Sequence, residues 1–283
     1  MTIASLILSF IFGLIVGSFI NVFILRYHTG VSLRGRSFCF SCGHALSWYE
    51  LIPLISFIFQ KGCCRTCRIP ISWRYPVTEL IAGLLFVAIF WKLGYVVSPG
   101  EGVINFQFSI FSIFLLLFYA VIFSLLLTIA LYDIRHKIIP NALVYLFIVL
   151  SFLHIFLINN SESITHHLFF GPLVALPFAA LWLFSKGTWI GLGDAKLALG
   201  IGWFLGFSFG ASAIIIAFWI GAAAGLALIL FSHIEMGARY LFRFPKRITI
   251  KSEIPFAPFL IIGTAFVFFY DISFTDILSL FMS

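Results

Sequence analysis

The sequence predicts an all-α polytopic membrane protein with about eight transmembrane helices and a small cytoplasmic domain between helices 1 and 2. Of its 283 residues, 62% are hydrophobic and 10% are charged, whereas an average soluble domain is about 45–50% apolar and about 25% charged. The hydrophobic residues form long runs, and the basic residues gather between these runs. Soluble enzymes, soluble binding modules and disordered chains are excluded, because none of them can keep so much apolar surface away from water.

The first expected helix is Ile3–Leu25, which carries no charge and is long enough to cross a hydrocarbon core of about 30 Å. It lacks the basic start and the short apolar core of a cleaved signal peptide, so we expect it to be a permanent anchor. On this helix Gly13 and Gly17 predict close packing against a neighbouring helix. Asn21 shares their face, and we expect it to make an interhelical hydrogen bond, with a ligand contact as the alternative.

Seven further helices are expected along the chain. The run from Ala195 to Phe231 is too long for one helix, and a Gly-rich bend at Gly206–Gly210 divides it into a short helix and one of ordinary length. The expected ranges are Val77–Val97, Phe108–Leu131, Ala142–Ile158, Leu168–Ser185, Ala195 to the bend, Ala211–Phe231 and Pro255–Tyr270.

The basic residues favour eight helices over seven and predict the orientation. Sixteen of the 17 Lys and Arg residues lie in the segments Arg26–Arg74, Arg135–Lys137, Lys186–Lys196 and Arg239–Lys251. Eight helices place all four segments on one side of the membrane, whereas seven would place the last one opposite. Because Lys and Arg concentrate in cytoplasmic loops, we expect the segments in the cytoplasm and both termini outside. The net charge of +7 is then explained by basic loops that face the anionic inner leaflet of the lipid bilayer. No nucleic-acid partner is therefore expected.

All five cysteines lie between the first two expected helices. They form the pair Cys39-x-x-Cys42 and, after 21 residues, the pair Cys64-x-x-Cys67, with Cys63 beside the second pair. Two such pairs at about this spacing are typical of a four-thiolate zinc site. The alternatives are two disulfides or reduced buried thiols, and disulfides need an oxidising compartment. The expected cytoplasmic location therefore favours zinc.

The predicted zinc site is structural rather than catalytic. Four thiolates leave no open coordination position for water, and the loop is too small to build a robust core without a metal. His44 is a competing ligand, although a solvent-exposed histidine is the simpler interpretation. Cys63 either replaces Cys64 or remains a free thiol.

Two aspartates stand out at the cytoplasmic ends of the expected helices. Asp133 lies just before Pro140, and Asp194 follows Gly191 and Gly193. Carboxylates near a bilayer are costly and usually face a partner or a water-filled cavity. If the two approach each other, they share one proton, so that one accepts a proton from water while the other polarises a peptide carbonyl. Spacing alone leaves an alternative open, in which each aspartate is a helix-end charge paired with Arg135, Lys137 or Lys196.

At these residues the sequence resembles the type IV prepilin peptidase family, the bifunctional leader peptidases and N-methyltransferases of bacterial inner membranes. The resemblance covers nearly the whole chain in the order of the family. The matching segments are Gly17–Arg26, Ser47–Pro53, the two cysteine pairs, Ile71–Pro76 with Glu79, Asp133 with Ile139–Asn141, Gly191–Asp194 and Ile254–Phe259. Two departures are Phe40, where the family often has proline, and the additional thiol of Cys63.

The resemblance implies a specific activity. The family cleaves the basic leader of type IV prepilins and pseudopilins at the cytoplasmic membrane face, and then methylates the new N-terminal residue with S-adenosylmethionine. Asp133 and Asp194 take the catalytic positions, and Cys39, Cys42, Cys64 and Cys67 take the zinc positions. It also implies a first transmembrane helix over residues 1–25, a zinc-binding, methyltransferase-associated loop domain over 26–76 and a transmembrane peptidase domain over 77–283.

The S-adenosylmethionine pocket cannot be located from the residues, because no glycine-rich methyltransferase motif is present. Asn21, Glu79 and the loop from Arg26 to Tyr75 are candidates through the resemblance alone, and scaffold contacts are an equal interpretation. Two other functions remain open at this point. One is a transporter or proton-relay protein that uses Asp133 and Asp194, although no internal repeat is visible. The other is a zinc-stabilised assembly scaffold, which would not need both aspartates.

Overall fold

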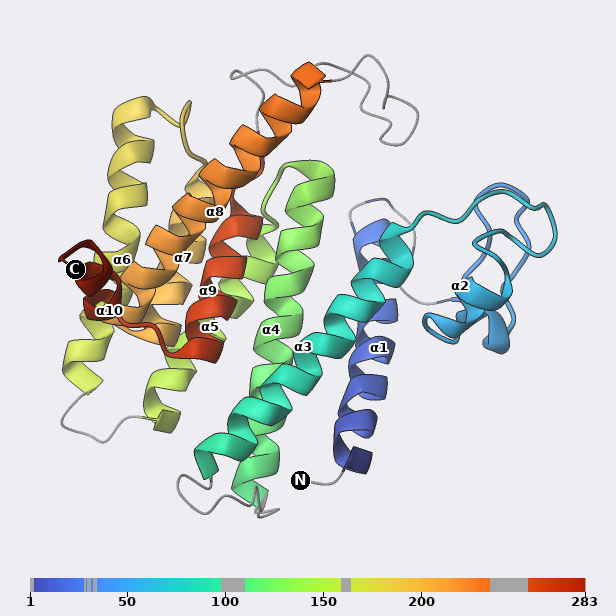
Figure 1. Ribbon diagram of the computed structural model, residues 1–283, viewed down its shortest axis with the longest axis horizontal. Helices are drawn as coiled ribbons and strands as arrows, with labels where there is room; N and C mark the ends of the chain where they lie inside the picture. The colour runs from blue at the N-terminus through green and yellow to red at the C-terminus, as the bar shows by residue number, and fades with distance from the viewer. Residues whose placement is uncertain are drawn as a thin grey trace. The chain divides into compact units, whose positions relative to one another are not determined.

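The computed structural model describes residues 3–27, 29, 32, 35–97, 110–158, 164–234 and 254–282. Within these ranges the regular elements are helices, together with two isolated β-bridges. In chain order they are α1 (Ile3–Arg26), η1 (Trp48–Leu51), α2 (Ile55–Phe59), α3 (Arg74–Val97), α4 (Ile110–His136), α5 (Asn141–Ile158), α6 (Ile164–Ser185), α7 (Leu192–Leu205), α8 (Phe207–Ile234), α9 (Ala257–Tyr270) and α10 (Phe274–Met282) (Figure 1).

Helices occupy all eight expected positions, and the predicted fold class is confirmed. Among the described residues, α1, α3, α4, α6 and α8 are long and apolar enough to cross a membrane, while α5 and α9 are shorter apolar helices. The chain is therefore a multi-pass membrane protein. Phe108, at the start of the third expected helix, and the basic segment Arg239–Lys251 lie outside the described residues.

The expected bend in the long apolar run is made by a single residue. Gly206 ends α7 with a φ of +83°, a left-handed conformation that favours glycine, and α8 begins at the next residue. The resulting α7 has 14 residues, so it is about 21 Å long and shorter than the hydrocarbon core. It contacts α5, α6, α8 and α9 (Figure 1). Leu197 and Ile201 on this helix are fully buried. Neighbouring helices therefore surround α7 in place of lipid.

The chain divides into two compact units at residue 128, and each is described by itself. In unit 1, which ends at Thr128, α1 packs along α3. A Cβ atom on Gly13 would lie 2.6 Å from the carbonyl oxygen of Ala82, so only glycine permits this approach. Asn21 Nδ2 donates a hydrogen bond to the backbone oxygen of Tyr75 at 3.1 Å. The expected close packing and the expected interhelical hydrogen bond are both present.

Unit 2 begins at Ile129 and contains a helix that the sequence analysis did not predict. This helix, α10, packs on α8. Asp276 Oδ2 accepts hydrogen bonds from the backbone N–H and the hydroxyl of Ser273, at 2.8 and 2.6 Å. A serine followed three residues later by an acidic residue is a helix-start signal, so the pattern from Ser273 to Asp276 was the overlooked sequence signal for α10.

Candidate active site and metal centre

The four predicted zinc ligands converge in unit 1. The Sγ atoms of Cys39, Cys42, Cys64 and Cys67 all lie within 4.8 Å of one another, and all four thiols are free. Cys39 Sγ and Cys67 Sγ are 3.8 Å apart. Tetrahedral zinc with Zn–S bonds of about 2.3 Å needs sulfur atoms about 3.8 Å apart. The cluster is therefore a site that could hold zinc with little rearrangement.

The two cysteine pairs are held by backbone turns of the same design. The N–H of Cys39 donates to the carbonyl oxygen of His44 at 2.9 Å, and the N–H of Cys64 donates to that of Ile69 at 2.9 Å. In each turn a residue four positions after the first cysteine has a left-handed backbone, with φ of +72° at Gly43 and +59° at Arg68. Each turn thus presents two sulfur atoms on one side, as metal ligation requires.

Cys63 and His44 lie outside the cluster. Cys63 forms a β-bridge with Pro70, just as Phe38 does with Ala45 in the first turn, and its sulfur is not among the clustered ones. His44 points its Nε2 atom toward Glu50 Oε2, at 3.6 Å. The structure thus groups Cys64, and not Cys63, with the other three cysteines.

Backbone donors prepare Cys39 for metal binding. The N–H groups of Cys42 and Ser41 point at its sulfur and lower the pKa of the Cys39 thiol to about 6. The thiolate is the form that binds metals, so at neutral pH this ligand is already deprotonated.

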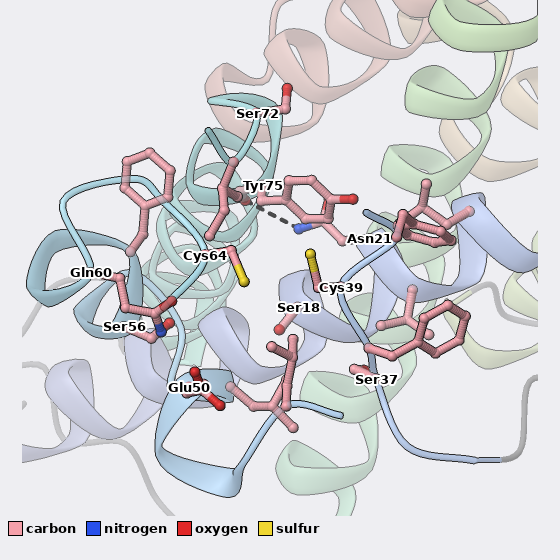
Figure 2. Close-up of a pocket in the computed structure, with 18 of the residues that line it drawn as sticks. Ser18, Asn21, Ser37, Cys39, Glu50, Ser56, Gln60, Cys64, Ser72 and Tyr75 are labelled. Atoms are coloured by element: carbon pink, nitrogen blue, oxygen red, sulfur yellow. Dashed lines mark hydrogen bonds between the residues drawn. The ribbon is translucent and has the colours of Figure 1, made fainter. Parts of the chain in front are cut away.

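A cavity of about 420 Å³ adjoins the cysteine cluster in unit 1. Its wall is formed by the end of α1, the two cysteine turns, η1, α2 and the start of α3 (Figure 2). Cys39 and Cys64 line it from the side of the cluster, and the polar side chains on the wall include Ser18, Asn21, Glu50, Gln60 and Glu79. The volume lies in the range of about 300–1,000 Å³ that small-molecule sites occupy.

Two carboxylates on the cavity wall connect its elements. Glu79 Oε2, on α3, accepts a hydrogen bond from the backbone N–H of Leu54 at 2.9 Å, and so ties the loop to the helix. Glu50 Oε2 accepts one from the backbone N–H of Ser47 at 2.8 Å. Glu50 is a residue of the site that was not predicted individually, although its spacing from Ser47 is a helix-capping signal.

Asp133 and Asp194 are both buried in unit 2, with 4% and 9% of their surface exposed. Asp133 lies in the last turn of α4, and its carboxylate accepts a hydrogen bond from the backbone N–H of Ala257 at the start of α9. The N-terminus of a helix carries a partial positive charge. This hydrogen bond holds the carboxylate of Asp133 at the start of α9.

Asp194 is in the first turn of α7, just before the apolar part of that helix, and has a different environment. Its carboxylate accepts a hydrogen bond from the N–H of Gly191, but its Oδ1 atom is buried and has no hydrogen-bond partner among the described residues. Burial, together with the nearby charge of Asp133, raises the pKa of Asp194 to about 7. The charge of Asp133 thus acts on Asp194, and near neutral pH Asp194 is protonated in a much larger fraction of molecules than an ordinary aspartate.

Short-range packing brings the helix ends around the aspartates together. A Cβ atom on Gly193 would lie 3.0 Å from Ile139 Cβ, so the glycine lets α7 approach the segment before α5. Lys196 Nζ donates a hydrogen bond to Asn141 Oδ1 at 2.9 Å and lies 4.8 Å from the ring centre of Tyr145. Within the described ranges, neither aspartate forms an ion pair with a lysine or an arginine.

The fold and the two sites define a multi-pass membrane enzyme with a buried acidic pair and a four-cysteine module. Residues 11–93 match the family model of the bacterial peptidase A24 N-terminal domain, and residues 120–226 match that of the type IV leader peptidase family.

Relatives extend this match to nearly the whole chain. The prepilin leader peptidase/N-methyltransferase of Bacillus subtilis is 32% identical over 263 residues, which is 92% of each chain. The protein of the same name from Vibrio cholerae is 28% identical over 93% of this chain and 96% of its own. The Myxococcus xanthus relative is 51% identical over 87 residues, 30% of this chain and 26% of its own. No solved structure matches the chain. The chain belongs to the type IV leader peptidase family, and a transporter or relay function is not favoured.

Proposed function

We propose that this protein cleaves the leader peptide of type IV prepilins or pseudopilins and methylates the new N-terminal residue. The observation that carries the proposal is the pair of interacting, buried aspartates within the region that matches the leader peptidase family. The names of the full-length relatives support both activities.

The environments of the two aspartates suggest a division of roles in hydrolysis. Asp133, which accepts the N–H of Ala257, takes a proton from the attacking water. Protonated Asp194, one oxygen of which has no partner among the described residues, donates a hydrogen bond to the carbonyl of the scissile peptide. The water oxygen then bonds to the carbonyl carbon, the C–N bond breaks and the leaving amine takes a proton from the pair. No metal or nucleophilic side chain takes part in these steps.

We place the peptidase site at the cytoplasmic face of a bacterial inner membrane. Asp133 and Asp194 lie at ends of helices whose flanking segments carry Arg135, Lys137, Lys186 and Lys196. Such clusters of Lys and Arg mark cytoplasmic loops. The basic leader of a prepilin would be on the same side as the aspartates.

Methyl transfer is assigned to unit 1. Cys39, Cys42, Cys64 and Cys67 would hold a zinc ion that fixes the two turns and completes the fold of the loop domain. S-adenosylmethionine would supply the methyl group, and the cavity beside the cluster has a suitable volume for it. The cavity wall also contains the buried carboxylate of Glu50, which suits a positively charged ligand.

Co-expression with a prepilin tests this function directly. Mass spectrometry of the pilin should show leader removal and the added mass of one methyl group in place of a hydrogen. Asp133→Asn and Asp194→Asn should leave the leader attached, whereas Asp276→Asn on the exposed surface of α10 should not. Unimpaired cleavage by both variants of the pair would overturn the assignment.

A further inference from the structure

Glu50 has a buried oxygen atom that has no hydrogen-bond partner in the part of the chain that the structure describes. Its side chain is 2% exposed, and Oε1 makes no hydrogen bond with any described residue. The other oxygen, Oε2, accepts the N–H of Ser47 and lies 3.6 Å from His44 Nε2. Figure 2 shows this carboxylate on the wall of the cavity.

The local structure does not explain why this residue is charged. The cap on η1 uses only one oxygen atom, and glutamine serves that role as well as glutamate in a capping box. A buried carboxylate oxygen without a partner is costly, and removing such groups from water is tolerated when a counter-charge completes the site. A partner for Oε1 would therefore come from a ligand in the cavity.

Among the described residues, the cavity wall has more carboxylates than basic side chains. Arg26 is the arginine that the described part of the wall contains, and it donates hydrogen bonds to the carbonyl oxygens of Ser32 and Arg36, both at 3.1 Å. Glu79 contributes a second carboxylate. The rest of the wall is largely apolar and includes Val22, Leu25, Leu46 and Phe57. An organic cation with an apolar body matches these features.

We propose that Glu50 Oε1 binds the cationic group of a reactant in methyl transfer. The inference rests on the proposed function and specifies the chemistry of its second site. Two reactants share this chemistry: the methyl donor has a sulfonium group, and the methyl acceptor has the N-terminal ammonium of a cleaved pilin. In both cases the carboxylate supplies a charge-assisted contact that a neutral analogue lacks.

The test compares charged and neutral probes by calorimetry on the purified full-length protein loaded with zinc. The donor arm compares S-adenosylmethionine with S-adenosylhomocysteine, which lacks the sulfonium charge. The acceptor arm compares a peptide that begins with a free phenylalanine amine with its N-acetylated form. Glu50→Gln removes the charge and keeps the acceptor for Ser47, Glu50→Asp keeps the charge, and Ser56→Ala alters the same wall without a charge change.

We expect wild-type protein to prefer the charged probe in one arm, and the arm identifies the reactant that Glu50 holds. Glu50→Gln should lower the affinity for the charged probe by about tenfold or more and leave the affinity for the neutral probe of the same arm unchanged. Ser56→Ala should keep the preference, and zinc content and leader cleavage should remain normal in both variants. A preference that survives in zinc-loaded Glu50→Gln would overturn the role of Glu50.

Two further outcomes separate this inference from the proposed function. Loss of zinc from both Glu50→Gln and Glu50→Asp would assign the residue to folding and overturn the inference, while methylation by the wild type would stand. If wild-type protein binds none of the four probes, the cavity is not the methyl-transfer site, and the inference fails with that assignment. If the Glu50→Asp variant keeps its zinc, it should retain more of the preference for the charged probe over the neutral probe than Glu50→Gln does.

Discussion

The metal cluster of unit 1 and the aspartate pair of unit 2 are built by different means. Each half of the cluster is a turn of a few residues, and the two turns repeat the same backbone hydrogen bonds. The aspartate pair instead needs the ends of α4, α7 and α9, which are far apart in sequence and meet only through helix packing. The comparison teaches that the structure and activity of the cysteine cluster should depend on metal binding. The activity of the aspartate pair should depend on helix packing and on protonation.

The largest expected effect is the loss of leader cleavage, without loss of methylation, when either aspartate of the pair is replaced. Asp133→Asn or Asp194→Asn should lower leader cleavage by about 10²–10⁴-fold, the usual contribution of general acid–base catalysis. Both variants should still methylate a peptide that already begins at the mature residue, because unit 1 is unchanged. Cleavage and methylation are measured separately by mass spectrometry. Equal loss of both activities would show that the sites are not independent.

Removal of a zinc ligand should produce the reverse pattern. Cys39→Ser should abolish zinc binding and methylation, since three thiolates no longer complete the tetrahedral site that stabilises the loop. Leader cleavage should persist at a substantial fraction of the wild-type rate. Cys63→Ser is the matched control, because its sulfur lies outside the cluster, and it should keep zinc by metal analysis. Zinc loss from Cys63→Ser alone would contradict the ligand assignment.

The two sites should also fail at opposite ends of the pH range. The raised pKa of Asp194, about 7, means that its proton is lost as the pH rises through this value, so cleavage should decline on the alkaline side. The lowered pKa of Cys39, about 6, means that protons compete with zinc as the pH falls through this value. Rates and zinc content measured across this range should show both trends. A cleavage rate that is flat across neutral and alkaline pH would contradict the protonated role of Asp194.

A smaller effect is expected from the glycines beside Asp194. Gly193→Ala would place Cβ 3.0 Å from Ile139, which must shift the start of α7 and lower cleavage by about tenfold. Gly191→Ala should cost less, because its Cβ would meet Asp194 Oδ2 at 3.5 Å and its φ of −73° suits any residue. Steady-state cleavage rates of the two variants give the comparison. A larger loss in Gly191→Ala would contradict the packing described for Gly193.

The sequence alone predicted features that depend on local composition and spacing. Apolar runs and basic loops predicted eight helices and the break near Gly206, because membrane insertion depends on the hydrophobicity of each segment. The spacing of Cys39, Cys42, Cys64 and Cys67 predicted the cluster, because each pair closes within one turn. The choice between Cys63 and Cys64 required the backbone, since both are compatible with the spacing.

Features that depend on distant contacts could not be read from the sequence. The hydrogen bond from Ala257 to Asp133 joins helices α4 and α9, and no local pattern indicates which helices meet. The cavity and the unpartnered oxygen of Glu50 arise from packing among α1, the loop and α3. For α10, by contrast, the capping pattern at Ser273 is local, but a helix of nine residues is too short for the apolar run that marks a membrane span.

Mixing two defective variants tests most directly whether the two sites act independently. One variant is Asp133→Asn, which retains the cysteine cluster, and the other is Cys39→Ser with Cys42→Ser, which retains the aspartates. Each is incubated with a prepilin, zinc and S-adenosylmethionine, alone and together, and the pilin is weighed by mass spectrometry. We predict uncut prepilin with the first, cut but unmethylated pilin with the second, and cut, methylated pilin only in the mixture. Complete product from either variant alone, or no methylated product in the mixture, would contradict two independent sites.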